Sequence, residues 1–153
     1  MRISLEHDAL KADLNAAAAA LGVQVQRVDK KQPSMTGRID RQRTLTITLP
    51  APSEVNARFM REGLLERAKK LFVREVEVGS TLFDDLIYVV TDTHDATTRL
   101  LGKQRVQQAL LLLIDETRHV EIDGNELRVV DTDSPDDGRD ATAEALALAA
   151  HLI

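Results

Sequence analysis

The feature that most constrains the fold is a short apolar run, Leu86–Val90, the only unbroken strand-like run of apolar residues in the chain. Isoleucine, tyrosine and valine favour strands. A buried helix segment is the competing interpretation, but Asp92 and Thr93 close the run too early for a helix. Because strand side chains alternate between faces, a run without alternation predicts a strand that is covered on both faces or lies mid-sheet.

Helix starts are expected on both sides of this run. Upstream, the tetrapeptide Thr-Leu-Phe-Asp at 81–84 has the character of a capping box and predicts a single helical turn. Downstream, we expect Asp92 to cap a helix that runs from Thr93 to Leu101, with Asp95 adding negative charge to its first turn. Gly102 is expected to end that helix.

Apolar residues at helical spacing predict the covering layer. They indicate helices at about 5–21, 94–116 and 141–153, the second of them interrupted at Gly102, and a shorter helix near 64–72. Gly22 stands where a glycine commonly follows a helix. We expect the three larger helical segments to cover one side of a sheet.

Alternation of apolar and polar residues predicts the strands, at 23–26, 35–39, 45–49, 55–59 and 76–78. In this interpretation residues 29–34 form a polar loop, and Asp40-Arg41-Gln42 joins the second strand to the third. Alternating strands leave one face of a sheet in water, which favours antiparallel order. The sequence therefore predicts a single α+β domain over residues 1–153, with a mostly antiparallel sheet packed against helices.

The clearest local signal is a hairpin centred on a two-residue turn at Gly124-Asn125. An alternative turn at Asp123-Gly124 would place Ile122 opposite Asn125, so we prefer the first. The preferred register sets three pairs of residues opposite one another: Ile122 and Leu127, Val120 and Val129, and Glu121 and Arg128 on the wet face.

Composition excludes several classes of function. A net charge of −5 argues against a nucleic-acid partner, which requires a basic face. The absence of cysteine removes disulfides, thiolate zinc sites and cysteine nucleophiles. The N-terminus turns polar at once, and no apolar stretch approaches the roughly 18 residues of a membrane span. We therefore expect a cytoplasmic protein that binds neither nucleic acid nor membrane.

Few residues suggest chemistry. Asp84 and Asp85 form a carboxylate pair beside the apolar run, and Asp92 and His94 invite a His–Asp dyad. Capping and solvation explain these residues more simply, because no nucleophile stands at a motif spacing. His7, His119 and His151 are isolated. We therefore assign no catalytic, cofactor-binding or metal-ligating residue and expect no cofactor.

Residues 79–130 resemble an uncharacterised bacterial domain family, a domain of unknown function otherwise found as the soluble part of membrane-anchored proteins. This chain departs from the family in lacking a membrane segment and in carrying His94 where proline is usual. The resemblance implies a fold rather than an activity, because the matching positions set the fold. They are Gly79, Phe83, Asp84, Val89, Thr91, Asp92, Arg99, Leu100, Leu101, Val120, Ile122, Gly124, Leu127 and Val129.

These observations favour a non-enzymatic cytoplasmic binding or assembly module that acts through another protein. The size and element order are also similar to those of bacterial secretion chaperones, without a shared motif. The alternative is a metal-assisted hydrolase built on Asp84, Asp85, Asp92 and His94.

A homodimer is a further hypothesis. The threonine face of strand 44–48 lacks charge, so an edge position would leave that strand open to pairing with a second copy. We prefer an internal position for it, between the strands at 35–39 and 55–59, because adjacent strands often pair.

Overall fold

The computed structural model of the 153-residue chain describes residues 14–33, 39–61, 86–117, 119–132 and 141–153. In chain order, its helices and strands are α2 (Leu14–Leu21), β1 (Gln24–Pro33), β2 (Ile39–Thr48), β3 (Asn56–Arg61), β4 (Ile87–Thr91), α4 (His94–Leu101), α5 (Gln104–Glu116), β5 (His119–Asp123), β6 (Glu126–Thr132) and α6 (Ala141–Leu152).

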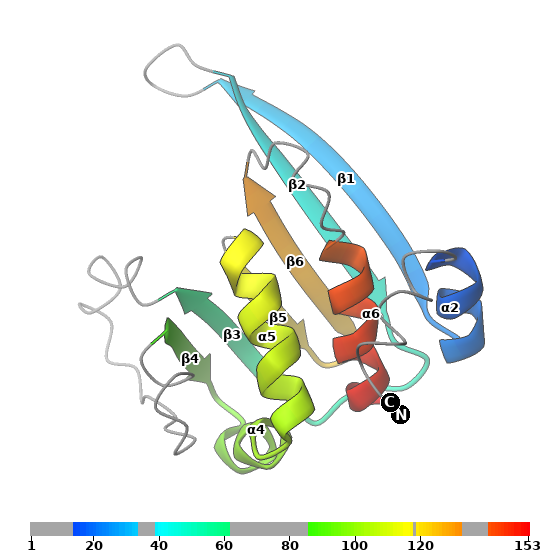
Figure 1. The fold of residues 1–153 in the computed structure, drawn as a ribbon, viewed down its shortest axis with the longest axis vertical. Helices are drawn as coiled ribbons and strands as arrows, with labels where there is room; N and C mark the ends of the chain where they lie inside the picture. The colour runs from blue at the N-terminus through cyan, green and yellow to red at the C-terminus, as the bar shows by residue number, and fades with distance from the viewer. Residues whose placement is uncertain (1–13, 34–38, 62–85, 118, 133–140) are drawn as a thin grey trace.

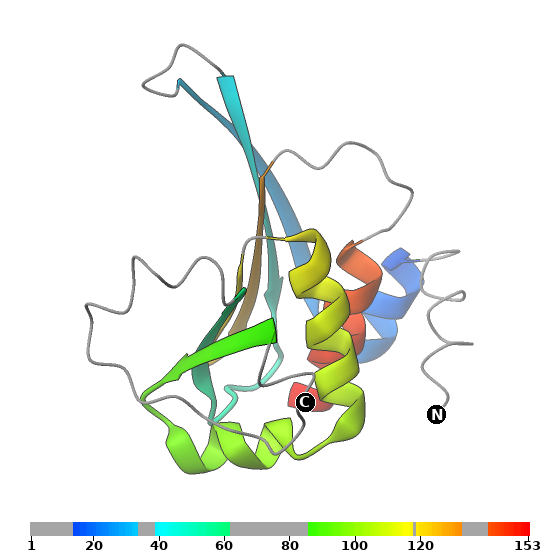
Figure 2. The ribbon, with the colours of Figure 1, turned by 60° about the vertical axis from the view of Figure 1, so that its left-hand side comes forward.

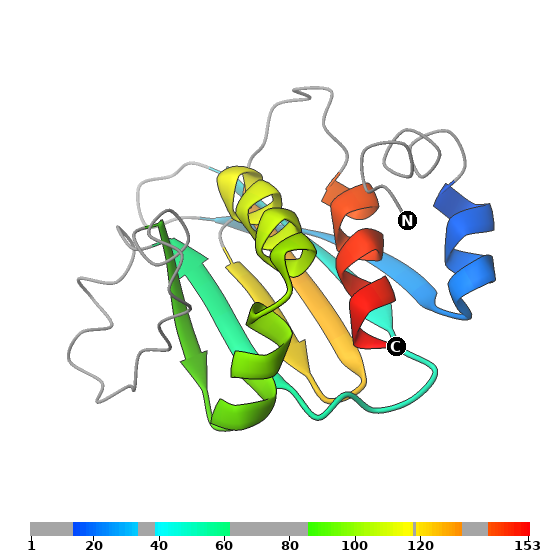
Figure 3. The same cartoon turned by 60° about the horizontal axis from the view of Figure 1, so that its bottom comes forward.

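The six strands form one sheet in the order β1-β2-β6-β5-β3-β4, and every neighbouring pair is antiparallel. Helices α2, α5 and α6 lie on one face of this sheet, with α4 below α5 (Figures 1, 2 and 3). The predicted α+β domain, with an antiparallel sheet covered by helices on one side, is confirmed.

The core lies between the sheet and the helices. Two rows of side chains cross the sheet on the helix side. One row runs from Ile47 through Leu127 and Ile122 to Ala57, and the other runs from Leu45 through Val129, Val120 and Phe59 to Val89. Leu110 and Leu113 of α5, with Leu146 and Leu148 of α6, are fully buried against these rows. Each such side chain stabilises the fold by about 1.5–3 kcal/mol, so this aliphatic layer fixes how the helices sit on the sheet.

The predicted hairpin is confirmed in its register. Ile122 pairs with Leu127, Val120 with Val129 and Glu121 with Arg128. The closing pair is Asp123 with Glu126, so the turn residues are Gly124 and Asn125. Gly124 has a φ of +57°, a conformation that glycine adopts without steric cost.

Two predictions about the first strands are wrong. Residues 29–33 belong to β1 rather than to a loop, and Asp40-Arg41-Gln42 lies within β2 rather than in a turn. β1 and β2 pair along their whole length, from Gln24 with Thr48 to Pro33 with Ile39. Their far ends form a two-stranded ribbon that extends beyond the other strands (Figure 1). The residues of this ribbon are mostly polar or charged, so they leave no apolar periodicity in the sequence.

Strand β2 is internal, as preferred, but its predicted neighbours are wrong. It lies between β1 and β6 rather than beside strands at 35–39 and 55–59. Both of its edges are paired, so the homodimer through the threonine strand loses its structural basis. The fourth predicted strand is confirmed as β3, with Ala57 and Phe59 buried.

The apolar run at Leu86–Val90 forms a strand, β4, but its predicted position is wrong. Among the strands that the structure describes, β4 is the last in the sheet order rather than a central one. Ile87 and Val89 are buried, whereas Tyr88 and Val90 are only half-buried. The run therefore alternates in burial although it does not alternate in polarity.

The helix predictions are confirmed where the structure describes them. α5 and α6 match the predicted 103–116 and 141–153 segments within one residue at each end, and Gly22 follows α2 with a φ of +70°. Other predictions lie outside the described residues: helix 5–21 before Leu14, strand 35–39 before Ile39, and the elements at 64–72, 76–78 and 81–84.

Gly124→Ala tests the hairpin. A Cβ at this position would meet no atom within 4 Å, so the cost is confined to the backbone and should be about 1–2 kcal/mol. Gly102→Ala is the matched control, because Gly102 has a helical φ of −66°. It should be neutral or stabilise the fold by up to about 1 kcal/mol. Urea denaturation measures both, and equal losses of stability in the two variants would contradict the assigned turn.

Candidate functional site

The structure describes two of the four residues proposed for chemistry, Asp92 and His94. Asp92, His94 and Asp95 are exposed around the turn between β4 and α4. Asp84 and Asp85 lie outside the described residues. In the parts of the chain that the structure describes, no group of three or more His, Cys, Asp or Glu residues could hold a metal ion.

The polar residues at this turn instead bind strand β3 to strand β4. The Thr91 hydroxyl donates to the Asn56 carbonyl oxygen at 2.6 Å, and the Asn56 N–H donates to Thr93 Oγ1 at 2.8 Å. The hydroxyl of Thr97, which is fully buried in α4, lies 2.8 Å from that of Thr91. Three threonines and one asparagine therefore connect β3, β4 and α4.

This network corrects the predicted helix cap. The N-cap of α4 is Thr93 rather than Asp92, and Thr93 makes no side-chain capping hydrogen bond. Its hydroxyl is engaged with Asn56 on the neighbouring strand instead. Asp95 lies in the first turn, and Gly102 ends the helix, as predicted.

The same contacts show which way the backbone of β4 points. The Asn56 N–H and C=O are both directed toward Thr91 and Thr93, which lie on the β4 side. Because backbone groups along a strand alternate between its two edges, those of Arg58 and Met60 also face β4. Their partners in the register are Val90 and Tyr88, so these two residues use their backbone groups to bind β3.

The remaining residues of β4 direct their backbone outward. Ile87, Val89 and Thr91 alternate with Tyr88 and Val90, so their N–H and C=O groups point away from β3. No strand that the structure describes pairs with this outer edge. Within the described part of the chain, β4 therefore presents the backbone donors and acceptors of three residues, Ile87, Val89 and Thr91, at the end of the sheet.

The side chains along this edge are uncharged. We call residues Leu86–Thr91 the β4 edge; its sequence, Leu-Ile-Tyr-Val-Val-Thr, contains no ionisable group except the tyrosine phenol. Leu86 is 49% exposed. Tyr88 and Val90 lie on the face opposite the helices, and Tyr88 pairs with half-buried Met60 of β3. The apolar side chains of β4 thus lie alongside backbone groups that no described strand pairs with.

The other end of the sheet has a different composition. β1 contains Asp29, Lys30 and Lys31 and ends at Pro33. Charged residues and proline on an edge strand oppose the addition of a further strand. The helix-free face between the two edges carries ion pairs, with Arg128 within 2.8 Å of Glu126 and 3.8 Å of Glu121, and Arg58 within 3.8 Å of Glu121. Of these surfaces, the β4 edge alone lacks charge.

The sequence contained one signal for this site. Leu86–Val90 is apolar at every position, a pattern that predicts a strand covered on both faces or lying mid-sheet. An edge strand that binds a further strand can also be uniformly apolar, because the bound strand covers side chains that are exposed in the free protein. Sequence alone therefore does not separate a central strand from an open edge of this kind.

Comparison with known proteins identifies no relative. No protein-family model matches the chain, and neither a curated protein nor a solved structure matches it. The resemblance of residues 79–130 to an uncharacterised bacterial domain family therefore stays a prediction. Among the described helices, none is long and apolar enough to cross a membrane.

Thr97→Val tests the network between β3, β4 and α4. Valine preserves the shape of the buried side chain but removes the hydroxyl contact with Thr91, so we expect a loss of about 0.5–1.5 kcal/mol. Thr98→Val is the matched control in the same helix. The Thr98 side chain is exposed and binds only the His94 carbonyl of its own helix, so its loss should stay within about 0.5 kcal/mol. Equal effects by urea denaturation would contradict a connecting role for Thr97.

Proposed function

We propose that this chain is a non-enzymatic protein-binding module that accepts an extended segment of another protein along the β4 edge. One observation carries the proposal: an edge strand directs the backbone of Ile87, Val89 and Thr91 outward and carries no charged side chain. Strand addition of this kind derives affinity from main-chain hydrogen bonds and specificity from side chains at alternate positions.

The chemistry of the edge indicates the chemistry of the partner. An added strand would bring its own side chains beside Tyr88 and Val90 on the helix-free face. Apolar or β-branched residues would pack there, whereas a charged residue would lose water without gaining a partner. The partner segment is therefore an uncharged stretch of about five residues that favours strand structure, in line with the length of β4.

Magnitudes show that the side chains decide the affinity. Three outward residues allow roughly six main-chain hydrogen bonds at about 1 kcal/mol each. Association costs about 4–15 kcal/mol in lost freedom of motion, so these hydrogen bonds alone give little net binding. Contacts with Tyr88, Val90 and Met60 have to supply the remainder, at about 1.5–3 kcal/mol for each large apolar side chain that becomes buried.

A cytoplasmic setting is part of this proposal. The chain contains no cysteine, so nothing in its folding depends on an oxidising compartment. Its net charge of −5 supports a protein partner over nucleic acid.

Val90→Lys is the central test. The Val90 backbone binds β3 and its side chain lies on the helix-free face, so the substitution adds a charge to the edge without removing a ladder hydrogen bond. We expect it to abolish binding of uncharged, strand-forming peptides selected from a displayed library. Thr46→Lys is the matched control, because Thr46 is half-buried on the same face in the paired interior of the sheet. Binding that survives Val90→Lys, or is lost equally in both variants, would contradict the proposal.

Amide hydrogen exchange gives a second test with an alternating pattern. In the unbound protein, the amides of Tyr88 and Val90 should exchange slowly, and those of Ile87, Val89 and Thr91 should exchange fast. A bound peptide should slow the second group by at least about tenfold and leave the first group unchanged. Protection of Val89 in the unbound monomer would show that the edge is already covered.

Light scattering tests whether the β4 edge binds another protein or a second copy of this chain. A mass near 17 kDa at high concentration leaves the edge available to another protein. A dimer that Val90→Lys dissociates, and Thr46→Lys does not, would show that a second copy of this chain fills the edge instead.

The metal-assisted hydrolase based on Asp84, Asp85, Asp92 and His94 is tested separately. No described contact of Asp92 or His94 favours it. We expect divalent metal ions to leave the melting temperature unchanged, to within about one degree. A stabilisation by metal that disappears in Asp84→Asn would favour the hydrolase over the binding module.

A further inference from the structure

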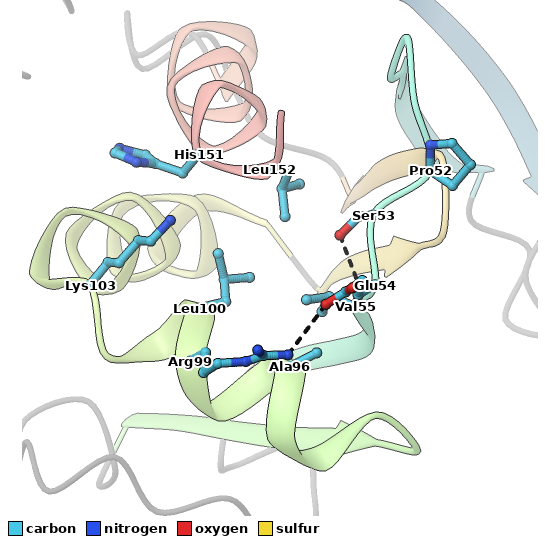
Figure 4. A pocket seen from close by; sticks show the side chains of 10 residues that line it. All are labelled: Pro52, Ser53, Glu54, Val55, Ala96, Arg99, Leu100, Lys103, His151 and Leu152. Carbon is cyan, nitrogen blue, oxygen red and sulfur yellow. Dashed lines mark hydrogen bonds and ion pairs between the residues drawn. The ribbon is translucent and has the colours of Figure 1, made fainter.

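A pocket of about 280 Å³ lies at the lower end of the molecule, away from the β4 edge. Four segments that are distant in the sequence form its walls: the loop that leads into β3, helix α4, the link between α4 and α5, and the end of α6 (Figure 4).

The walls of the pocket are held in place by hydrogen bonds. On one side, the Ser53 N–H donates to the Gly124 carbonyl at 2.6 Å, and the Val55 N–H donates to Ser53 Oγ at 3.1 Å. On the other side, the Lys103 N–H donates to the Leu100 carbonyl at 3.2 Å. The Gln107 amide also donates to the Leu101 carbonyl at 2.6 Å. The backbone on either side of the opening is therefore preorganised.

The ionisable residues of the pocket are mostly basic, in a chain whose net charge is −5. Arg99 of α4, Lys103 of the link and His151 of α6 come from three separate elements, and Glu54 is the single acid in the lining. Arg99 Nη2 lies 3.3 Å from Glu54 Oε2, with both side chains largely exposed. The lining therefore contains two cationic side chains, Arg99 and Lys103, one carboxylate, Glu54, and the imidazole of His151.

Lys103 is the cation best placed to receive a ligand. Its ammonium forms no ion pair with any residue that the structure describes. In Figure 4 the Lys103 and His151 side chains lie on the same side of the opening, across from Glu54 and Ser53. An anion between Lys103 and Arg99 would compete with Glu54 for the guanidinium.

The base of the pocket is apolar. Val55 and Leu100 are buried, and Ala96 and Leu152 are half-buried where they face the opening. In Figure 4 the Leu100 and Leu152 side chains point toward the space between the basic residues and the β3 loop. An apolar base beneath a basic rim suits a ligand that has both an apolar part and a negative charge.

We propose that this pocket binds a small organic carboxylate with a short aliphatic body. The carboxylate would lie between Lys103 and Arg99, and the body would contact Leu100 and Leu152. A single carboxylate can pair with Lys103 beside the Arg99–Glu54 ion pair, whereas a phosphate or sulfate would make no use of the apolar base. A neutral hydrocarbon of the same length would make no favourable electrostatic interaction with Lys103 and Arg99 at the rim.

The expected affinity is low, because the rim is exposed. An exposed ion pair contributes about 0.2–1 kcal/mol, which corresponds to a factor of up to about five in the dissociation constant. Burial of the aliphatic body adds to this contribution and is largely offset by the cost of association. Together these terms predict a dissociation constant on the order of tens of millimolar for a six-carbon carboxylate.

Titration of the full chain with hexanoate, followed by two-dimensional amide NMR, tests the proposal. We expect saturable shifts for the amides of Val55, Ala96 and Lys103, and none along β4. Hexanol supplies the apolar body without the charge, and sulfate supplies charge without the body, so both should bind more weakly than hexanoate, hexanol by about two- to fivefold. Equal binding of hexanoate and hexanol, equal binding of hexanoate and sulfate, or no saturable shift at roughly ten times the expected dissociation constant of hexanoate would overturn the proposal.

Two substitutions with opposite expected effects make the test specific. Lys103→Gln should weaken hexanoate binding about two- to fivefold, and Glu54→Gln should strengthen it by a similar factor because Arg99 is released from its partner. Arg58→Gln removes an exposed positive charge on the opposite face and serves as the control for net charge. All three residues are exposed, so the amide spectra should show that each variant is folded. A Lys103→Gln effect no larger than that of Arg58→Gln would overturn the assignment of the rim.

Discussion

The arrangement of β3, β4 and α4 depends on the hydrogen bonds of Asn56. Its backbone N–H and carbonyl bind the Thr93 and Thr91 side chains, and its own side-chain oxygen accepts the Gly124 N–H at 2.8 Å. A single residue at the start of β3 therefore joins the β4 turn to the β5–β6 hairpin. The direction of its backbone also determines which groups of β4 face the open edge. The proposed binding surface thus follows from the local geometry of Asn56.

The sequence predicted the local elements well and their neighbours poorly. The Gly124-Asn125 turn determines its own register, because a glycine with positive φ and two alternating strands leave few alternatives. The pairing of β2 with β6 joins residues far apart in the chain, and nothing in either strand specifies the other. Uniformly apolar residues at 86–90 were equally compatible with a central strand and with an open edge.

The candidate sites were beyond sequence reasoning for a related reason. The β4 edge is recognised only when the sheet order is known, since its composition alone suggests burial. The pocket collects Glu54, Arg99, Lys103 and His151 from separate segments, and each of these residues in isolation is an ordinary surface charge. In contrast, Asp92 and His94 are close in sequence, but the structure assigns the polar contacts at that turn to threonines.

The pairing of β2 with β6 also has a consequence for folding during synthesis. Thr48 lies opposite Glu126 and Gln42 opposite Thr132, so the interior of the sheet closes only after residue 132 has left the ribosome. Until then Leu45 and Ile47, which are buried in the finished sheet, have no β6 beside them. Pairing between distant segments slows folding, and an unpaired strand is prone to associate with other chains. The β1–β2 hairpin is therefore the part of the sheet that is most open to association with other chains during this interval.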